Sequence, residues 1–438
     1  MQRFSTTAHE SKLGISRGML AFSIMALALG AALRLSYSTD MEYKGDEHYT
    51  FDRSQHIGVD EPWPDLGMVS SGGIRNPGMG NWVFHTLAIV WRAKSPVALA
   101  RSVALTSILA AILLFFLTVN VVPRKEREAW LWAGALAAVN PLAMILQRKI
   151  WAPSILPIFC VVFLYGWLRR DTWRGAIAWG FIGPILGQIH MGAFFFSFGF
   201  FVWEAVLGTL RNRAQGRAPT QWFGWVAGSI LGAIPLVPWV RYVLSGVDHG
   251  EKWNGDEVLS GRFFLTWLSD GMGLGVDYSL GKHYWDFLRY PLIGDRDFYP
   301  ALYMHGVSFS AGLVILIAAL VAAFRWIRAG GTLSSAIARS SETAHTLGAA
   351  FFGYGFAITL AGLHIFRHYL HVTFPLEWLA FSYLAFTTKL HRPRVVLAVM
   401  WLAQLGLSAT FLHYIHVNGG AVGADYGPAY STQNHGRR

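Results

Sequence analysis

Charged residues are scarce in this chain, and their scarcity excludes an ordinary soluble domain. Of the 438 residues, 14% are charged and 53% are hydrophobic, whereas soluble domains carry roughly 25% charged residues. Apolar runs recur along the whole length and are long enough for membrane helices, which need about 20 residues each. The composition therefore predicts an all-α polytopic membrane protein, with residues 1–438 forming a single integral membrane domain.

Several functional motifs are also missing. The one cysteine, Cys160, lies inside an apolar run, which excludes a disulfide within the chain and a cysteine metal site. The sequence has no P-loop and no Gly-x-Ser-x-Gly elbow, so ATP hydrolysis and serine hydrolase chemistry have no support. The net charge of +11 comes from small, separate basic groups. A nucleic-acid partner is not expected, because it would require a basic cluster interleaved with aromatics.

The distribution of charge predicts the orientation in the membrane. Cytoplasmic loops are enriched in Lys and Arg, and alternate loops here carry basic groups such as Arg124–Arg127, Arg169–Arg174 and Arg211–Arg217. Of the 25 acidic residues, eight lie within 40–65 and nine within 248–297, in the other set of loops. The N-terminus is therefore expected in the cytoplasm and the C-terminus outside, after about 11 spans. The expected spans are residues 18–35, 97–121, 129–147, 152–168, 175–189, 191–210, 221–241, 301–324, 345–362, 369–387 and 395–413.

Two outer segments are too long to be simple connectors. They cover residues 36–96 and 242–300, and loops of such length are usually functional or disordered. Both contain aromatic residues, including Trp63 and Trp267, which disfavours disorder. Short helices lying at the membrane interface are expected within 261–290.

The first outer segment begins with a dense polar stretch that contains Asp46 and Glu47. Adjacent carboxylates at a membrane surface can supply a general base, or they can simply belong to a solvated loop. Further along, Arg148 and Lys149 end the third predicted span on the outer side, against the basic-inside trend. They suit a lipid phosphate, and the alternative is that both extend to lipid headgroups.

Four polar residues stand at helical spacing near the outer surface: His364, Arg367, His368 and His371. On a helix they would share one face, where they would bind phosphate, form a polar packing interface or, with His190 and an outer acid, hold a divalent metal.

Three further acidic features are weaker signals. Glu204 and Glu377 fall inside predicted spans. An ionisable group within the membrane suggests a functional site, and the alternative is that each glutamate pairs with another helix and fixes the packing. Asp295–Asp297 resembles the Asp-x-Asp motif of nucleotide-sugar enzymes, yet it is expected outside and is interpreted as a loop feature.

Several short motifs resemble the C-fold (GT-C) membrane glycosyltransferases, which include protein O-mannosyltransferases and lipid A aminoarabinose transferases. The resembling segments are Gly45–Tyr49; Trp63–Pro64 through Ser70–Gly78; Asn140–Pro141 with Gln147–Trp151 and Pro157; and Arg367–Tyr369 with Pro375. The likeness follows the order and topology of most of the chain. It departs at Asn76-Pro77-Gly78, where many relatives have two consecutive prolines.

The resemblance implies transfer of a hexosyl or pentosyl group from a polyprenyl-phosphate-linked sugar on the outer face, to a glycan, lipid or protein acceptor. It implies a carboxylate of the first outer segment as the catalytic base. We predict Asp46 in this role, with Glu47 positioning it or binding a metal, and direct displacement would invert the anomeric centre. Arg148, Lys149, Arg367 and His368 would hold the phosphate, and His190 and Tyr369 would contact substrate.

Two other functions remain open from the sequence. A transporter or flippase would depend on Glu204 and Glu377, and a non-catalytic partner in polysaccharide assembly would need neither these nor the outer acids. A bacterial inner membrane is the default location.

Overall fold

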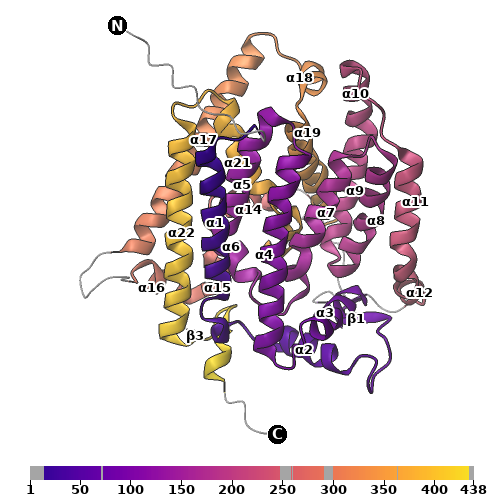
Figure 1. Ribbon diagram of the computed structural model, residues 1–438, viewed down its shortest axis with the longest axis vertical. Coiled ribbons are helices and arrows are strands. Elements are labelled where there is room, and N and C mark those ends of the chain that lie inside the picture. The colour runs from indigo at the N-terminus through magenta and orange to yellow at the C-terminus, as the bar shows by residue number, and fades with distance from the viewer. Residues whose placement is uncertain are drawn as a thin grey trace.

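The computed structural model describes residues 14–70, 73–246, 258, 260–290, 299–362 and 364–433. Within those ranges the chain forms a bundle of helices along one long axis (Figure 1). Six helices are long and apolar enough to cross a membrane, which agrees with the predicted class. They are α1 (Arg17–Leu35), α4 (Pro96–Asn120), α9 and α10 with the π-helical stretch between them (Gly192–Gln215), α11 and α12 (Trp222–Leu244), α17 (Pro300–Arg328) and α22 (Pro393–Asn418).

Local sequence explains where these helices begin. Ser16 caps α1 by accepting the amide of Met19 at 3.2 Å, and Ser95 caps α4 by accepting the amide of Ala98 at 3.2 Å. Such caps satisfy amides that have no partner within the helix. The predicted spans for these six helices agree with the structure to within about five residues, the error expected at helix ends.

The other five predicted spans are at least partly helical but are not among the six, so the count of about 11 spans stays a prediction. Their helices are α5 (Arg127–Val139), α6 (Pro141–Leu146), α7 (Leu156–Leu168), α8 (Trp173–Ile189), α19 (Glu342–Gly348), the π-helical stretch Ala349–Tyr354, α20 (Gly355–Leu360) and α21 (Leu376–Thr387).

Two predicted spans are interrupted. Span 129–147 breaks at Asn140, whose side chain caps α6 through the amide of Ala143 at 3.1 Å and donates to the Asp270 carbonyl at 3.0 Å. Pro141 follows and cannot donate a backbone hydrogen bond. Span 369–387 begins instead with the 3₁₀ turn Arg367–Thr373, and α21 starts after Pro375.

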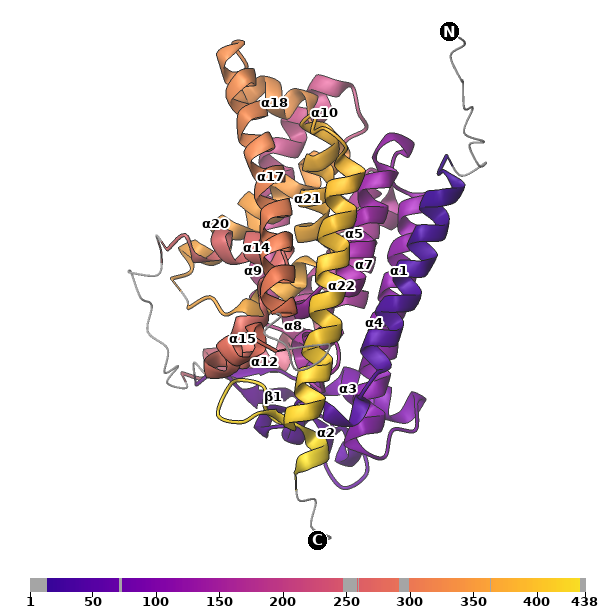
Figure 2. The same ribbon diagram turned by 90° about the vertical axis from the view of Figure 1, so that its left-hand side faces the viewer.

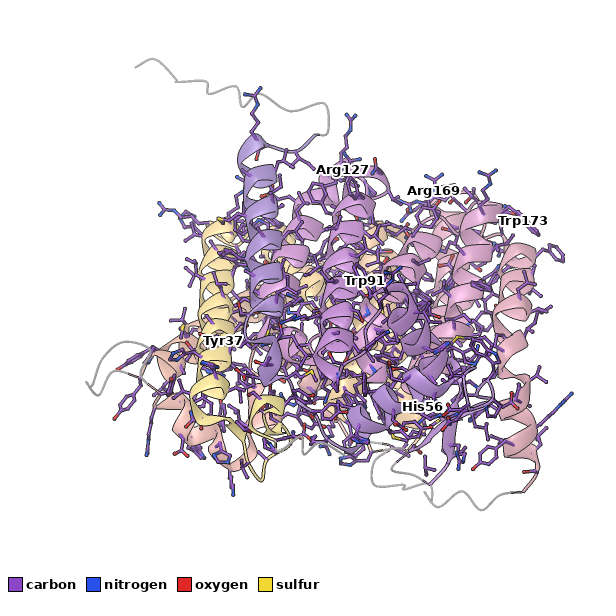
Figure 3. All side chains as sticks on the ribbon, turned by 60° about the horizontal axis from the view of Figure 1, so that its bottom comes forward. Tyr37, His56, Trp91, Arg127, Arg169 and Trp173 are labelled. Carbon is purple, nitrogen blue, oxygen red and sulfur yellow. The ribbon has the colours of Figure 1, made fainter. Side chains whose placement is uncertain are left out.

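The described part of residues 36–96, the helices within residues 276–288 and the segment after α22 lie at one end of the bundle, at the bottom of Figures 1 and 2. We name it the outer end after the orientation expected from the sequence. Arg127 and Arg169 lie at the opposite end from His56 (Figure 3). The elements of the outer end are α2 (Gly45–His56), β1 (Leu66–Val69), β2 (Arg75–Pro77), α3 (Met79–Val90), α15 (Val276–Leu280), α16 (Tyr284–Leu288), β3 (Gly420–Ala421) and β4 (Gly427–Pro428), and the opposite end carries α18 (Leu333–Arg339).

Helix α14 (Arg262–Gly271) differs from the expectation of an interfacial helix. Phe263 and Trp267 are fully buried, and the helix packs against α20 and α21. The expectation failed because an amphipathic helix has the same pattern whether its apolar face meets lipid or protein. Trp253 and Asp295–Asp297 lie outside the described residues.

Arg34, in the last turn of α1, ties the start of the first outer segment to the broken helix α5–α6. The buried guanidinium donates to the Ala138 carbonyl at 2.6 Å and to Gln147 Oε1 at 2.6 and 2.9 Å. The Ala137 and Ala138 carbonyls end α5, where a cation is favourable. This contact fixes Gln147, which opens the turn leading to the outer cavity.

Replacing Arg34 by Met is expected to destabilise the folded protein by about 3 kcal/mol, because Gln147 and the α5 carbonyls would lose their donors while remaining buried. Thermal unfolding in detergent measures the change. Arg17→Met is the matched control, since Arg17 lies at the exposed start of the same helix. Equal midpoints for the two variants would contradict the role given to Arg34.

Candidate active site

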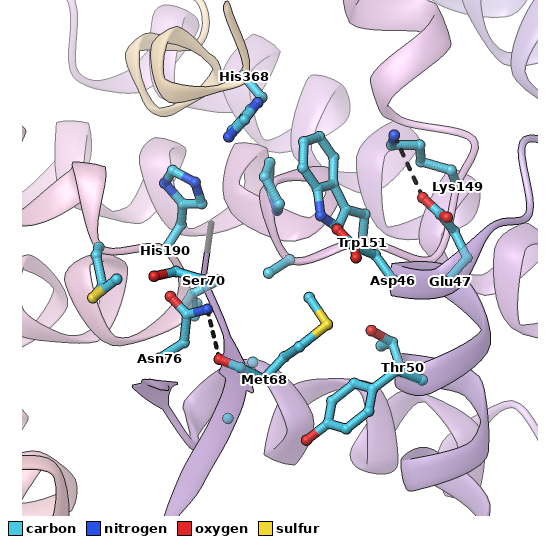
Figure 4. A pocket seen from close by; sticks show the side chains of 18 of the residues that line it. Asp46, Glu47, Thr50, Met68, Ser70, Asn76, Lys149, Trp151, His190 and His368 are labelled. Carbon is cyan, nitrogen blue, oxygen red and sulfur yellow. Dashed lines mark hydrogen bonds and ion pairs between the residues drawn. The ribbon is translucent and has the colours of Figure 1, made fainter. Parts of the chain in front are cut away.

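A cavity of about 560 Å³ opens at the outer end of the bundle. Its wall combines the start of α2, the β1–β2 hairpin, α3, the turn 149–153, the α8–α9 junction and the 3₁₀ turn Arg367–Thr373. Figure 4 shows two sides of this cavity. One carries Asp46, Glu47 and Lys149, the other carries His190 and His368, and Trp151 lies between them.

The acidic side is built around a buried ion-pair cluster. Lys149 Nζ lies 3.0 Å from Glu42 Oε2 and 3.4 Å from Glu47 Oε1, and the three side chains are at most 6% exposed. Lys149 also lies 4.0 Å from the centre of the Trp151 ring. Glu42 additionally pairs with Lys44 at 2.7 Å. Two carboxylates therefore share one buried lysine, and that lysine joins the turn after α6 to α2.

Burial and ion pairing shift the pKa values of this cluster in opposite directions. Burial raises the pKa of Glu42 above its ordinary value, and the neighbouring Glu47 adds to the rise, although Lys149 and Lys44 oppose it. Burial alone would lower the pKa of Lys149, but Glu42 and Glu47 outweigh it and the pKa is raised. Lys149 is thus charged at neutral pH and compensates the two acids.

Asp46 differs from its neighbours. It lines the cavity and is only half-buried. No group in the described part of the chain hydrogen bonds to its carboxylate or forms an ion pair with it. Glu47, by contrast, accepts the Lys44 amide at 2.9 Å and pairs with Lys149. Of the predicted acid pair, Asp46 is therefore the residue available to a substrate.

The opposite side presents two neutral histidines. Burial lowers the pKa of His190 to about 4 and lowers that of His368 well below its ordinary value. Their rings lie edge to face with centres 5.3 Å apart, and each Nδ1 is buried without a hydrogen bond to any described residue. Because an unpaired buried polar atom is costly, these nitrogens are suited to a bound ligand. Tyr369 lines the same side.

Two of the predicted phosphate ligands lie off the cavity wall. The Arg148 guanidinium is buried and donates to the Ser36 and Tyr37 carbonyls, the latter at 2.9 Å. Arg367 is held by the second outer segment, 2.9 Å from Asp277 and 3.3 Å from Asp270.

The predicted polar stripe of His364, Arg367, His368 and His371 does not form, because residues 367–373 are a 3₁₀ turn rather than an α-helix. Among them, His364 lies 3.3 Å from Arg262 and His371 lies 3.3 Å from Gln147, so their partners differ. Across the described ranges no three His, Cys, Asp or Glu side chains are grouped to hold a metal ion. The residues present do not fit the divalent metal considered from the sequence.

The two glutamates that the sequence places inside predicted spans have structural partners. Glu204 lies 2.9 Å from Arg170 and 2.8 Å from His345, and it accepts the Thr220 hydroxyl at 2.5 Å. Glu377 accepts the Thr373 hydroxyl. Neither residue lines the outer cavity.

Sequence reasoning did not assign a role to several residues of the cavity. Glu42, Trp151 and Asn76 occur in or beside the motifs but were not distinguished from them. Tyr278 and Asp425 come from distant segments. One feature of the sequence distinguished Asp425: it is the sole acidic residue after the last predicted span.

No protein-family model and no curated protein matches this chain. Among solved structures it is similar to the archaeal oligosaccharyltransferase AglB from Archaeoglobus fulgidus in complex with an inhibitory peptide and a dolichol-phosphate, with 13% identity and a TM-score of 0.43. The apo form of the Archaeoglobus fulgidus oligosaccharyltransferase gives 12% identity and a TM-score of 0.44. The matches cover 94% and 95% of this chain but 56% and 57% of the solved chains, so this chain spans little more than half their length.

Lys149→Met is expected to destabilise the protein in a pH-dependent way. At pH well below 4.5, Glu42 is protonated in folded and unfolded chains, and the loss is small. As pH rises through the folded-state pKa of Glu42, which is raised above 4.5, the unsubstituted protein ionises Glu42 beside Lys149. In the variant this pKa rises further without the lysine, so Glu42 stays protonated in the folded chain. The loss of stability relative to the unsubstituted protein therefore grows with pH, to about 3 kcal/mol at neutral pH.

Thermal unfolding in detergent between pH 4 and pH 8 measures this difference, with the exposed Lys94→Met as the control. A difference that does not change across this pH range would show that Lys149 does not compensate the buried acids.

Proposed function

We propose that this protein is a membrane glycosyltransferase that moves a hexosyl or pentosyl group from a polyprenyl-phosphate donor to an acceptor hydroxyl at the outer end of the bundle. In this proposal the outer end faces the periplasm or lumen, and the N-terminus is cytoplasmic. The observation that carries it is the unpaired Asp46 carboxylate facing a cavity whose other side holds two neutral histidines.

Asp46 suits the role of general base. A base must reach the proton that it removes, and it must not already be neutralised by a cation. The Asp46 carboxylate meets the second condition among the described residues, because Lys149 and Lys44 are engaged by Glu42, Glu47 and Asp425. It lies in the first turn of α2.

His190 and His368 suit the phosphate of the donor. A neutral imidazole carries one N–H, and each ring has a buried Nδ1 that lacks a partner in the described chain. A phosphate oxygen would accept from such donors, and they stabilise charge as it develops on the leaving group. Lys149 has a different part in this proposal from the one the sequence suggested, since it holds Glu42 and Glu47 in place. Arg148 and Arg367 lie off the cavity and are not assigned to the donor.

The atoms and electrons of the reaction balance among donor, acceptor and protein. The acceptor hydroxyl loses its proton to Asp46 while its oxygen forms a bond to the anomeric carbon. The bond between that carbon and the phosphate oxygen breaks, and both electrons leave with the polyprenyl phosphate. A direct displacement of this kind inverts the anomeric centre.

Asp46→Asn is expected to lower kcat for transfer by roughly 10²- to 10⁴-fold, because the amide cannot accept the proton. Transfer of a radiolabelled hexose or pentose from its polyprenyl phosphate, catalysed by purified protein in lipid vesicles, measures the effect. The matched control is Asp52→Asn, whose carboxylate is 56% exposed on the same helix and does not line the cavity.

Glu204→Gln and Glu377→Gln separate this function from transport. Both glutamates have partners inside the bundle, so their loss is expected to lower stability while folded protein keeps transfer activity. Full transfer by Asp46→Asn would disprove its role as base. Vesicle uptake that depends on the two glutamates and not on Asp46 would favour a transporter instead.

A further inference from the structure

The segment that follows α22, Gly419–Gln433, lies directly against the first outer segment. The Tyr430 amide donates to the Met41 carbonyl at 3.0 Å, Glu42 and Ala429 form an isolated antiparallel bridge, and the Gln433 side chain donates to the Tyr43 carbonyl at 2.9 Å. These contacts follow the backbone that leads into α2. We refer to Gly419–Gln433 as the strap.

Asp40 anchors the strap. Its carboxylate is 7% exposed and accepts the Ser431 hydroxyl at 2.7 Å, with His416 Nδ1 also at 2.7 Å. The Tyr426 hydroxyl donates to the Asp40 carbonyl. A buried carboxylate with a partner on each oxygen makes a specific attachment.

The strap also reaches the second outer segment. The Tyr426 amide donates to the Ser279 carbonyl at 2.9 Å, and His283 Nε2 lies 2.8 Å from the Val422 carbonyl. Tyr278, next to Ser279, lines the cavity. The strap therefore joins the two outer segments, each of which contributes residues to the cavity wall.

Asp425 lies at the point where the strap meets the cavity. Lys44 Nζ donates to the Asp425 carbonyl and lies 3.5 Å from its carboxylate. Asp425 itself lines the cavity. Lys44 is the residue that precedes α2, and its own amide is accepted by Glu47. Lys44 is thus fixed through its backbone by α2, and through its side chain by Glu42 and by the strap.

We propose that Asp425 is a positioning residue that acts through Lys44 to hold the first turn of α2, and with it Asp46, in place. The first turn of a helix lacks intrahelical partners for its amides and frays easily. Here the first helical residue is the exposed Gly45, which packs against nothing within 4 Å of its Cβ position. Asp46 comes next, so the Lys44 anchor limits the movement of its carboxylate. This inference rests on the proposed function for the role of Asp46, whereas the positioning itself can be measured without a substrate.

A thiol introduced by Asp46→Cys in the full-length chain reports the local structure. The native Cys160 is buried, so it contributes little background. Labelling of purified protein by a charged maleimide is followed over time, and Val59→Cys, at a site that is 80% exposed just beyond α2, serves as the reference thiol.

Asp425→Lys replaces a partly exposed ion pair by two neighbouring positive charges and is expected to raise the labelling rate at position 46 by about threefold, the order that corresponds to one such pair. The rate at position 59 stays unchanged. Asp286→Lys, an exposed site on α16 that does not line the cavity, is the matched control and has no effect.

An unchanged rate at position 46 in Asp425→Lys overturns the proposal. Equal rises at positions 46 and 59 also overturn it, because they indicate general loosening. These outcomes are independent of transfer activity. Full transfer by Asp46→Asn would refute the proposed function and leave the labelling result as it stands.

Discussion

The outer cavity depends on three consecutive side chains in the turn after α6. Gln147 accepts Arg34 at the end of α1, Arg148 donates to the carbonyls of Ser36 and Tyr37, and Lys149 pairs with Glu42 and Glu47. The partners of these three residues follow one another along the chain, from the end of α1 to the start of α2. Because all three are buried, losing one leaves polar groups that neither water nor another residue can satisfy. The turn therefore fixes how the first outer segment leaves the bundle and where α2 begins.

The same arrangement explains why one acid of the cluster differs from the rest. Glu42 and Glu47 are neutralised in the protein interior and hold α2 in place. Asp46, between them in the chain, points into the cavity (Figure 4) without a cation of its own in the described structure. Successive side chains of a helix are about 100° apart around its axis. Asp46 and Glu47 are neighbours in the sequence, yet Glu47 therefore faces the protein interior while Asp46 faces the cavity.

The spanning helices were predictable because their signal is local. A run of about 20 apolar residues identifies a spanning helix whatever surrounds it, and six such predictions agree with the structure. The interruption at Asn140 and the 3₁₀ turn before Pro375 were not predicted. Both depend on partners far along the chain, as when Asn140 donates to Gln404 and to the Asp270 carbonyl.

The sequence by itself determined the membrane class, the separation of basic and acidic loops, and the polar stretch that contains Asp46, because composition and charge are summed over local segments. Tertiary structure alone decided that Lys149 would be buried between two carboxylates while Arg148 would turn to backbone carbonyls. It also brought Asp425 to the cavity from the far end of the sequence. These choices follow from which groups meet after packing and from the cost of burying a charge without a partner, and neither quantity is defined until the helices are assembled.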